Sequence, residues 1–195
     1  MRSEAIKQAN TERPIHDIIL SRWSARSFSE KAIAQADVET ILEAATWAFS
    51  ANNSQPWHYF YAHHADTEAF QKIWSCLAPG NQPWCANAAV LLVSCIHKVN
   101  AEGKPNNWAM HDLGAANATL MLQATTMGIY GHPMAGFDKA KTIETFSLNA
   151  EILEPVAFIA LGYLDEPEKL GEPFRTRELT PRTRKGVAEI SERLG

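Results

Sequence analysis

The segment Ala88-Ala89-Val90-Leu91-Leu92-Val93-Ser94-Cys95-Ile96 is the most apolar stretch of the chain. A membrane-spanning helix needs about 20 apolar residues, so this segment is far too short to cross a bilayer. Short, continuous apolar runs that are rich in β-branched residues are typical of strands buried on both faces. We therefore predict a central buried strand here, with the other elements arranged around it.

Further strands and helices are predicted on both sides of this segment. Residues 57–62 are rich in aromatic side chains and residues 156–162 form another apolar run, so both are expected to be strands. Apolar residues recur at helical spacing in the longer segments between them. Helices are therefore predicted over residues 16–21, 36–48, 67–77, 108–127 and 138–146, with a last short helix near the C-terminus.

Glycine and proline divide these elements from one another. Residues 79–83 and 130–137 each contain both residue types and are predicted to be loops. The tail, residues 164–195, is rich in proline and charge. Strands separated by long helices indicate an α+β or three-layer fold. No domain boundary is evident, so residues 1–195 are predicted to form a single domain.

The composition excludes several classes of protein. A net charge of −4 argues against general nucleic-acid binding, which needs a basic surface. Residues 1–13 are polar, so we expect no signal peptide, and no membrane association is predicted. Cys76, Cys85 and Cys95 form no Cys-x-x-Cys motif and are odd in number. Reduced thiols in a cytoplasmic protein are therefore expected.

Two basic segments could bind an anion. In an extended chain Arg22, Ser24 and Arg26 would point the same way and could converge on a phosphate, which arginine binds through a bidentate fork. In the tail, Arg182 and Arg184 follow Pro181, which would keep them extended. Solvated surface arginines remain the alternative for both segments.

The turn Asn52-Asn53-Ser54-Gln55-Pro56-Trp57 is a more specific feature. Side-chain amides such as those of Asn53 and Gln55 carry a donor and an acceptor together, which matches the polar edge of an isoalloxazine or uracil-like ring. An ordinary turn explains Asn and Ser, but it explains Gln followed by Pro-Trp less well.

Other candidate sites lack the residues that their chemistry needs. His63-His64 has no carboxylate or Cys at ligand spacing, so no metal site is predicted. His111-Asp112 has no Gly-x-Ser-x-Gly elbow to complete a triad. No Gly-x-Gly-x-x-Gly or Walker-type loop is present, so a nicotinamide cofactor would have to bind as a substrate.

Several segments, taken in order, resemble the nitroreductase family. The family pattern is Arg-(Arg/His/Lys)-Ser-x-(Arg/Lys)-x-(Phe/Tyr), then a helix, then Pro-Ser-x-x-Asn-x-Gln-Pro-Trp. The chain departs from it at Trp23 and Phe49, and also at Ala135, where the family often has Gly or Glu. The matching segments are Arg22–Phe28, Phe49–Trp57, Gly80–Trp84, His111–Ala116, Gly131–Asp138, Gly162-Tyr163 and Arg182–Arg184.

This resemblance implies an α+β fold with a central, mostly antiparallel sheet wrapped by helices, in an obligate homodimer. It also implies flavin mononucleotide (FMN) at the dimer interface. Arg22, Ser24, Arg26 and Arg184 would hold the phosphate, with Arg182 as a helper. Asn81 would meet the polar edge of the ring, while Asn53 and Gln55 reach in from the partner chain. Residues 133–136 would cover the ring. The remaining predicted cofactor-binding residues are Trp23, Phe49, Ser50, Ala51, Pro133, Met134, Ala135 and Gly136.

The resemblance further implies that NAD(P)H reduces FMN, and that a small-molecule acceptor such as a nitroaromatic or quinone then takes the reducing equivalents in a ping-pong cycle. No side chain is predicted to be a catalytic acid or base. One alternative is a different flavin reaction on the same scaffold, such as enone reduction or dehalogenation. Others are a flavin-binding or regulatory protein without turnover, and a protein that binds no flavin.

Overall fold

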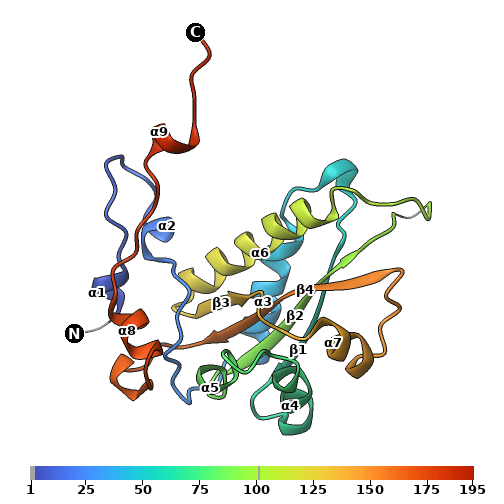
Figure 1. Ribbon diagram of the computed structural model, residues 1–195, viewed down its shortest axis with the longest axis horizontal. Coiled ribbons are helices and arrows are strands. Elements are labelled where there is room, and N and C mark those ends of the chain that lie inside the picture. Colours follow the sequence, from blue (N-terminus) through green and yellow to red (C-terminus); the bar gives the residue numbers. More distant parts are fainter. Residues whose placement is uncertain (1–2, 101) are drawn as a thin grey trace.

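A computed structural model describes residues 3–100 and 102–195, and its centre is a 4-stranded sheet (Figure 1). Every neighbouring pair of strands is antiparallel. The predicted α+β class, the antiparallel sheet and the predicted central strand are confirmed. Across the sheet the strands lie in the order β1 (Trp57–His63), β2 (Val90–His97), β4 (Leu153–Gly162) and β3 (Tyr130–Met134).

β2 is buried on both faces, as its apolar run predicts. Leu91 and Val93 pack into one hydrophobic core, whereas Val90 and Leu92 pack into another. Successive side chains of a strand point to opposite faces, so these cores lie on the two sides of the sheet. The core around Val90 contains residues of α3 (Gln35–Thr46) and α6 (Ala109–Thr126), and the core around Leu91 contains residues of α4 (Thr67–Ser75) and α5 (Gln82–Cys85).

The prediction of a loop over residues 130–137 is wrong for its first part, which forms β3. β3 pairs only with β4 and lies at the edge of the sheet. Proline is tolerated in such a strand because no ladder bond is lost on the open side, and Pro133 occupies that place. Gly131 allows α6 to approach, since a Cβ atom there would lie 2.4 Å from Sδ of Met121. Glycine and proline therefore mark close packing and an edge here.

Residues 79–83 were also predicted as a loop, but α5 begins within them at Gln82. Pro83 fits the first turn of this helix because an N–H there would have no intrahelical partner. The other predicted helices are confirmed, with small differences at their ends. They include α2 (Asp17–Ser21), α3, α4, α6, α7 (Lys139–Thr145) and the short C-terminal α9 (Val187–Ile190).

The N-terminal helix and the start of the C-terminal tail lie together at one edge of the molecule (Figure 1). The short helix α1 (Ser3–Lys7) packs against α8 (Phe174–Leu179), which follows η2 (Pro167–Lys169). Beyond α8 the chain runs past α2, and α9 and the last residues extend away from the body. No helix in the described residues has the length and apolar character needed to cross a membrane.

Candidate cofactor site

Residues Arg22 to Arg26 form an extended segment directly after α2. Trp23 and Ala25 are buried, at 3% and 0% exposed, whereas Arg22, Ser24 and Arg26 are half-buried. Successive side chains of an extended segment point to opposite sides, so every second side chain lies on the same side. The burial pattern therefore agrees with the predicted common direction of the three polar side chains.

The C-terminal tail brings more positive charge to this segment. Arg182 donates hydrogen bonds from Nη1 to the carbonyl oxygen of Arg22 and from Nη2 to that of Leu20. Burial lowers the pKa of the Arg22 guanidinium, and the nearby charge of Arg184 lowers this pKa further. In the described part of the chain, Arg22, Arg182 and Arg184 form no ion pair. Uncompensated positive charge therefore gathers where two distant segments meet, which suits an anion.

Arg182, predicted as a phosphate helper, also makes main-chain contacts. Its terminal nitrogens already donate to main-chain carbonyls, so they fasten the tail to the end of α2. Its Nε atom is buried and has no hydrogen-bond partner among the described residues. A buried donor without a partner is costly, and a bound anion beside it would remove that cost.

Asn81 and Gly136, which were predicted to lie at the flavin ring, are in contact with each other. Nδ2 of Asn81 donates a hydrogen bond to the carbonyl oxygen of Gly136 at 2.9 Å. Pro133 and Ala135 are exposed, whereas the side chain of Met134 is buried. Residues 133–136 thus offer mainly their main chain to a ligand.

Arg26 connects this contact to the basic segment. Its guanidinium lies 5.7 Å from the ring centroid of Trp84, which belongs to α5. Asn81 is the residue directly before α5. Trp84 and Trp23 belong to the same hydrophobic core, so the basic segment and the Asn81–Gly136 contact lie on the same side of the sheet.

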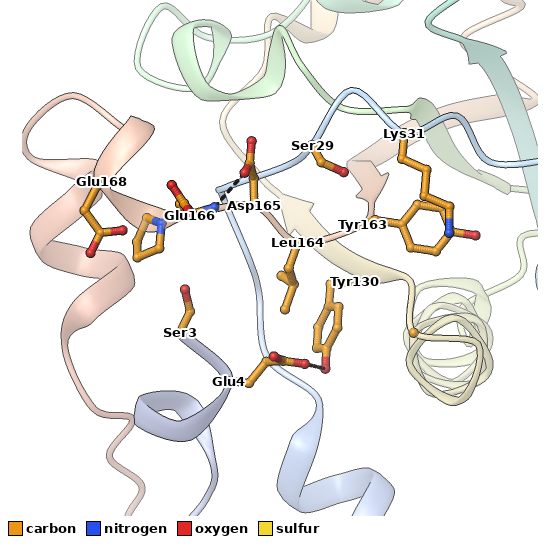
Figure 2. Close-up of a pocket in the computed structure, with 12 residues that line it drawn as sticks. Ser3, Glu4, Ser29, Lys31, Tyr130, Tyr163, Leu164, Asp165, Glu166 and Glu168 are labelled. Carbon is orange, nitrogen blue, oxygen red and sulfur yellow. Dashed lines mark hydrogen bonds between the residues drawn. The ribbon is translucent and has the colours of Figure 1, made fainter. Parts of the chain in front are cut away.

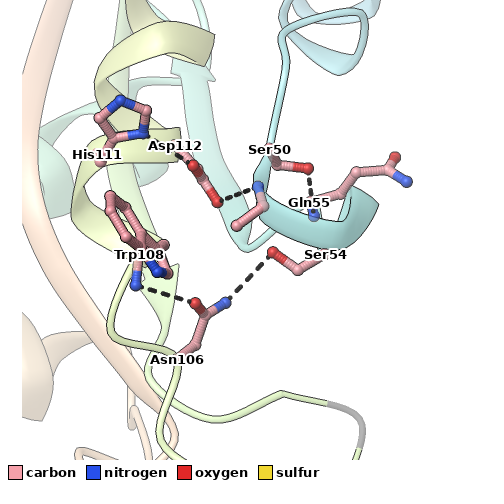
Figure 3. Close-up of polar contacts among 8 residues, drawn as sticks. Ser50, Ser54, Gln55, Asn106, Trp108, His111 and Asp112 are labelled. Carbon is pink, nitrogen blue, oxygen red and sulfur yellow. Dashed lines mark hydrogen bonds and ion pairs between the residues drawn. The ribbon is translucent and has the colours of Figure 1, made fainter.

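The amide-rich turn is tightly built, and Figure 3 shows how it is held. Asn53 and Gln55 have positive φ angles of 55° and 43°, a conformation that non-glycine residues adopt rarely. Oγ of Ser50 accepts from the Gln55 N–H at 3.1 Å, and Oδ2 of Asp112 accepts from the Ala51 N–H at 3.0 Å. The start of α6 therefore fixes the turn while the Asn53 and Gln55 side chains remain exposed.

Large apolar side chains shortly before this turn in the sequence and at the start of α6 are exposed. Trp47 is 82% exposed, Phe49 69%, Trp108 61% and Met110 52%. Phe49 and Trp108 both lie beside the His111 ring, with centroid distances of 5.7 Å and 5.8 Å. Exposed apolar surface of this kind marks interaction sites in soluble proteins.

The described chain keeps the two parts of the predicted site apart. The amide turn adjoins the start of α6, whereas Arg22–Arg26 lies beside α1, α2 and α8, at the other end of the molecule (Figure 1). The structure therefore brings Arg22, Arg182 and Arg184 together, places Arg26 beside Trp84 and places Asn81 beside residues 133–136. It does not bring Phe49, Ser50, Ala51, Asn53 or Gln55 to either group.

A cavity of about 800 Å³, lined in part by Tyr130, has the wrong charge for a phosphate (Figure 2). Its lining includes Glu4, which accepts a hydrogen bond from the Tyr130 hydroxyl at 3.4 Å. Asp165, Glu166 and Glu168 also line it. An anionic cofactor is therefore expected at the arginines and not here.

Two buried residues hold the Arg22–Arg26 segment, and neither was predicted from the sequence. Glu178 accepts from Nε1 of Trp23 and from the Arg26 N–H, each at 3.2 Å. His132 donates from Nδ1 to the carbonyl oxygen of Ala25 at 3.0 Å, and burial lowers its pKa to about 4. The side chain of Trp23, where the sequence departs from the family pattern, faces this core and not the arginines. No local pattern marks Glu178, which lies in a tail rich in charged residues.

The histidine pair His63-His64 lies at the end of β1. No group of His, Cys, Asp or Glu side chains suited to a metal ion occurs in residues 3–100 and 102–195. Nε2 of His63 is instead 2.8 Å from Oε1 of Gln35, in a contact at the surface.

Comparisons with known proteins bear on the family and the fold of the chain. The family model described as "Nitroreductase family" matches residues 19–163. A putative NADH dehydrogenase/NAD(P)H nitroreductase of Archaeoglobus fulgidus is 32% identical over 112 residues, which cover 57% of this chain and 62% of that protein. The match thus spans less than two thirds of the archaeal protein's length.

Solved structures share the fold. One described as an oxidoreductase containing FMN has a TM-score of 0.87 and 34% identity, covering 94% of this chain and 93% of the other. CLA-ER, an enone reductase of gut-bacterial fatty acid saturation metabolism, has a TM-score of 0.76 and 20% identity, covering 92% of this chain and 97% of the other. With the family model matching most of its length, the chain belongs to the nitroreductase family.

Proposed function

We propose that this protein is an FMN-dependent oxidoreductase that takes hydride from NAD(P)H and reduces nitroaromatic, quinone or similar electron-poor acceptors by a ping-pong mechanism. The observation that carries this proposal is the cluster of Arg22, Arg182 and Arg184, whose charges have no counter-ion in the described residues. A solved oxidoreductase that contains FMN, at 34% identity, supports the identity of the anion.

The donor set fits a phosphate ester. Arg22, Ser24, Arg26 and Arg184 would hold the phosphate through charged and hydroxyl donors, and the buried Nε of Arg182 adds one unused donor beside them. A terminal phosphate carries up to two negative charges, so its binding would offset the mutual repulsion of these arginines. Arg182 would otherwise act as the anchor of the tail.

The ring of FMN would lie along the Asn81–Gly136 contact. Residues 133–136 have no polar side chain, so they would cover a planar ring with apolar atoms and meet its polar atoms through a main-chain N–H. FMN, when bound, supplies the redox chemistry, and the residues of the chain bind it, orient it and surround it with positive charge. No side chain is assigned as an acid or base.

We further propose that the protein works as a homodimer of single-domain chains. The amide turn that carries Asn53 and Gln55 lies at the other end of the molecule from the segment after α2, so a second copy would have to bring these side chains to the flavin (Figure 1). Trp47, Phe49 and Trp108 give this face the apolar area that a stable interface buries. The cytoplasmic location stays a prediction from the reduced cysteines.

A different flavin reaction on this fold is the second candidate. The enone reductase with a TM-score of 0.76 supports it, although at 20% identity it shows the fold alone. A flavin-binding protein without turnover is the other alternative. The acceptor separates the first two candidates, and reduction by NAD(P)H separates both of them from the third.

The visible spectrum of the purified protein tests the proposal. We expect a flavin band that bleaches when NAD(P)H is added without oxygen and returns when a quinone or nitroaromatic compound is added. Return of the band with enones alone would favour the second candidate. A band that does not bleach would favour binding without turnover. Colourless protein that binds no FMN on titration would contradict the proposal.

A further inference from the structure

Glu178 is an acid buried in the protein, in α8 and directly behind the basic segment. Its side chain is 0% exposed. Oε1 accepts a hydrogen bond from Nε1 of Trp23, and Oε2 accepts one from the Arg26 N–H, each at 3.2 Å. Burying a carboxylate is costly unless it is well hydrogen-bonded. Both donors to this carboxylate belong to the Arg22–Arg26 segment. The carboxylate therefore joins α8 to that segment at two points.

The position of α8 is itself fixed by the N-terminal helix. Nζ of Lys7 donates to the carbonyl oxygens of Arg177 and Thr180, at 2.7 Å and 2.6 Å. These carbonyls lie on either side of Glu178 in the sequence. Burial raises the pKa of the Glu178 carboxyl, while the Trp23 hydrogen bond and the charges of Lys7 and Arg26 oppose that rise. The carboxylate thus has cations on both sides, at α1 and at the basic segment.

Strand β3 also holds the segment. His132 of β3 donates to the Ala25 carbonyl at 3.0 Å, and the Trp23 ring packs on Tyr130 with centroids 4.4 Å apart. Contacts at Trp23, Ala25 and Arg26 therefore fix the main chain from the core side. The side chains of Arg22 and Ser24 remain on the other side, where the phosphate is proposed to bind.

We propose that Glu178 is a positioning residue for the phosphate site, in which its carboxylate clamps the Trp23 indole and the Arg26 main chain so that Arg22, Ser24 and Arg26 are aligned before FMN binds. This inference rests on the proposed binding of FMN. Glu178 does not touch the ligand, and it acts through the main chain of the segment.

Whether one substitution strengthens or weakens FMN binding distinguishes a positioning role from a simple charge effect. Glu178→Gln keeps the size of the side chain and removes a negative charge near an anion site. An effect through charge alone would make FMN bind more tightly, because repulsion is lost. A positioning role predicts weaker binding, since an amide has one oxygen acceptor and its NH₂ group would face one of the two donors.

The test measures the FMN dissociation constant of the apoprotein by fluorescence titration, with the thermal midpoint of each variant. The variants are Glu178→Gln, Trp23→Phe and the double substitution. Trp23→Phe keeps aromatic packing on Tyr130 and removes the N–H donor, so it tests the same clamp if Glu178→Gln folds poorly. Glu172→Gln is the matched control, because Glu172 is exposed and bonds only within the first turn of α8, to Arg175 and Thr176.

We expect each single clamp variant to weaken FMN binding roughly tenfold, as for loss of a hydrogen bond to a charged group. The double variant should lose less than the product of the two, since both changes break one bond. The Trp23 indole N–H signal in the NMR spectrum, assigned with Trp23→Phe, should move upfield in Glu178→Gln. The control should change the FMN dissociation constant less than about twofold.

Unchanged or tighter FMN binding by Glu178→Gln would overturn the inference. The inference is also overturned if Glu178→Gln and Glu172→Gln lower the thermal midpoint equally and Glu178→Gln loses no more FMN affinity than Glu172→Gln. If the wild-type protein binds FMN and the clamp variants match it, only the positioning role fails. If the wild-type protein does not bind FMN, the proposed function fails.

Discussion

Replacing Arg22 by alanine should have opposite effects on FMN affinity and on the stability of the apoprotein. The guanidinium of Arg22 is half-buried, and it has no ion-pair partner in the described residues. Burial and the charge of Arg184 both lower its pKa, so the fold disfavours its charged form. Removing that charge relieves desolvation and repulsion in the apoprotein, and the free energy of unfolding should stay equal or rise.

The loss of affinity follows from the hydrogen bonds that the guanidinium would make to the phosphate. A hydrogen bond to a charged group contributes about 1.5–3 kcal/mol. At about 1.4 kcal/mol per tenfold change, this corresponds to roughly 10- to 150-fold weaker FMN binding. Arg184→Ala should behave in the same way, because Arg184 would contact the same phosphate.

Fluorescence titration of apoprotein with FMN and urea unfolding without FMN measure the two effects. Arg13→Ala is the control, since Arg13 is exposed and its removal changes the net charge equally. Arg13 is not one of the proposed phosphate ligands, and exposed charges are screened beyond about 8 Å at physiological ionic strength, so little change is expected. If Arg22→Ala and Arg184→Ala both bind FMN as the wild-type protein does, the phosphate assignment is refuted.

Three further predictions concern the fold and the assembly. The pKa of His132 is about 4 in the folded protein, which is below its unfolded value, so the fold favours neutral His132 and this contribution to stability is complete above pH ~6.5. The free energy of unfolding should therefore fall by about 3 kcal/mol as the pH drops to ~4. Urea unfolding of His132→Gln should show a shallower pH dependence. Gly131→Ala places a Cβ atom 2.4 Å from Met121 Sδ and should cost about 1–3 kcal/mol in the same assay, whereas Gly171→Ala, with no atom within 4 Å, should be nearly neutral. Trp47→Ser combined with Trp108→Ser should shift sedimentation toward monomer and weaken FMN binding, and a wild-type monomer that binds FMN fully would contradict the dimer.

Much of the fold could be predicted because its signals are local. The apolar run of β2 and the helical spacing in α3 and α6 specify which faces are buried, and each signal lies within one element. β3 was missed because glycine and proline normally indicate loops. Only pairing with β4 at the sheet edge and packing against α6 make Gly131 and Pro133 suitable for a strand.

At the candidate site, only the features that depend on neighbouring residues could be predicted. The spacing of Arg22, Ser24 and Arg26 already indicates a shared direction, since it depends only on the two-residue period of an extended chain. The same reasoning cannot distinguish Arg184, which is exposed, from Arg182, which is committed to main-chain carbonyls. That difference depends on where the tail crosses the end of α2.

The sequence by itself determined the central strand, the kinds of donor available to an anion and the amide-rich turn. These features depend on the chemistry of each residue and on the spacing of residue types over short segments of the chain. The tertiary structure decided that Arg182 is an anchor, that Trp23 faces the core and that Glu178, 152 residues from Arg26 in the chain, holds the basic segment. Such contacts form only when distant segments pack and bury polar groups that must then find partners. No local pattern of residues records which partner each buried group will meet.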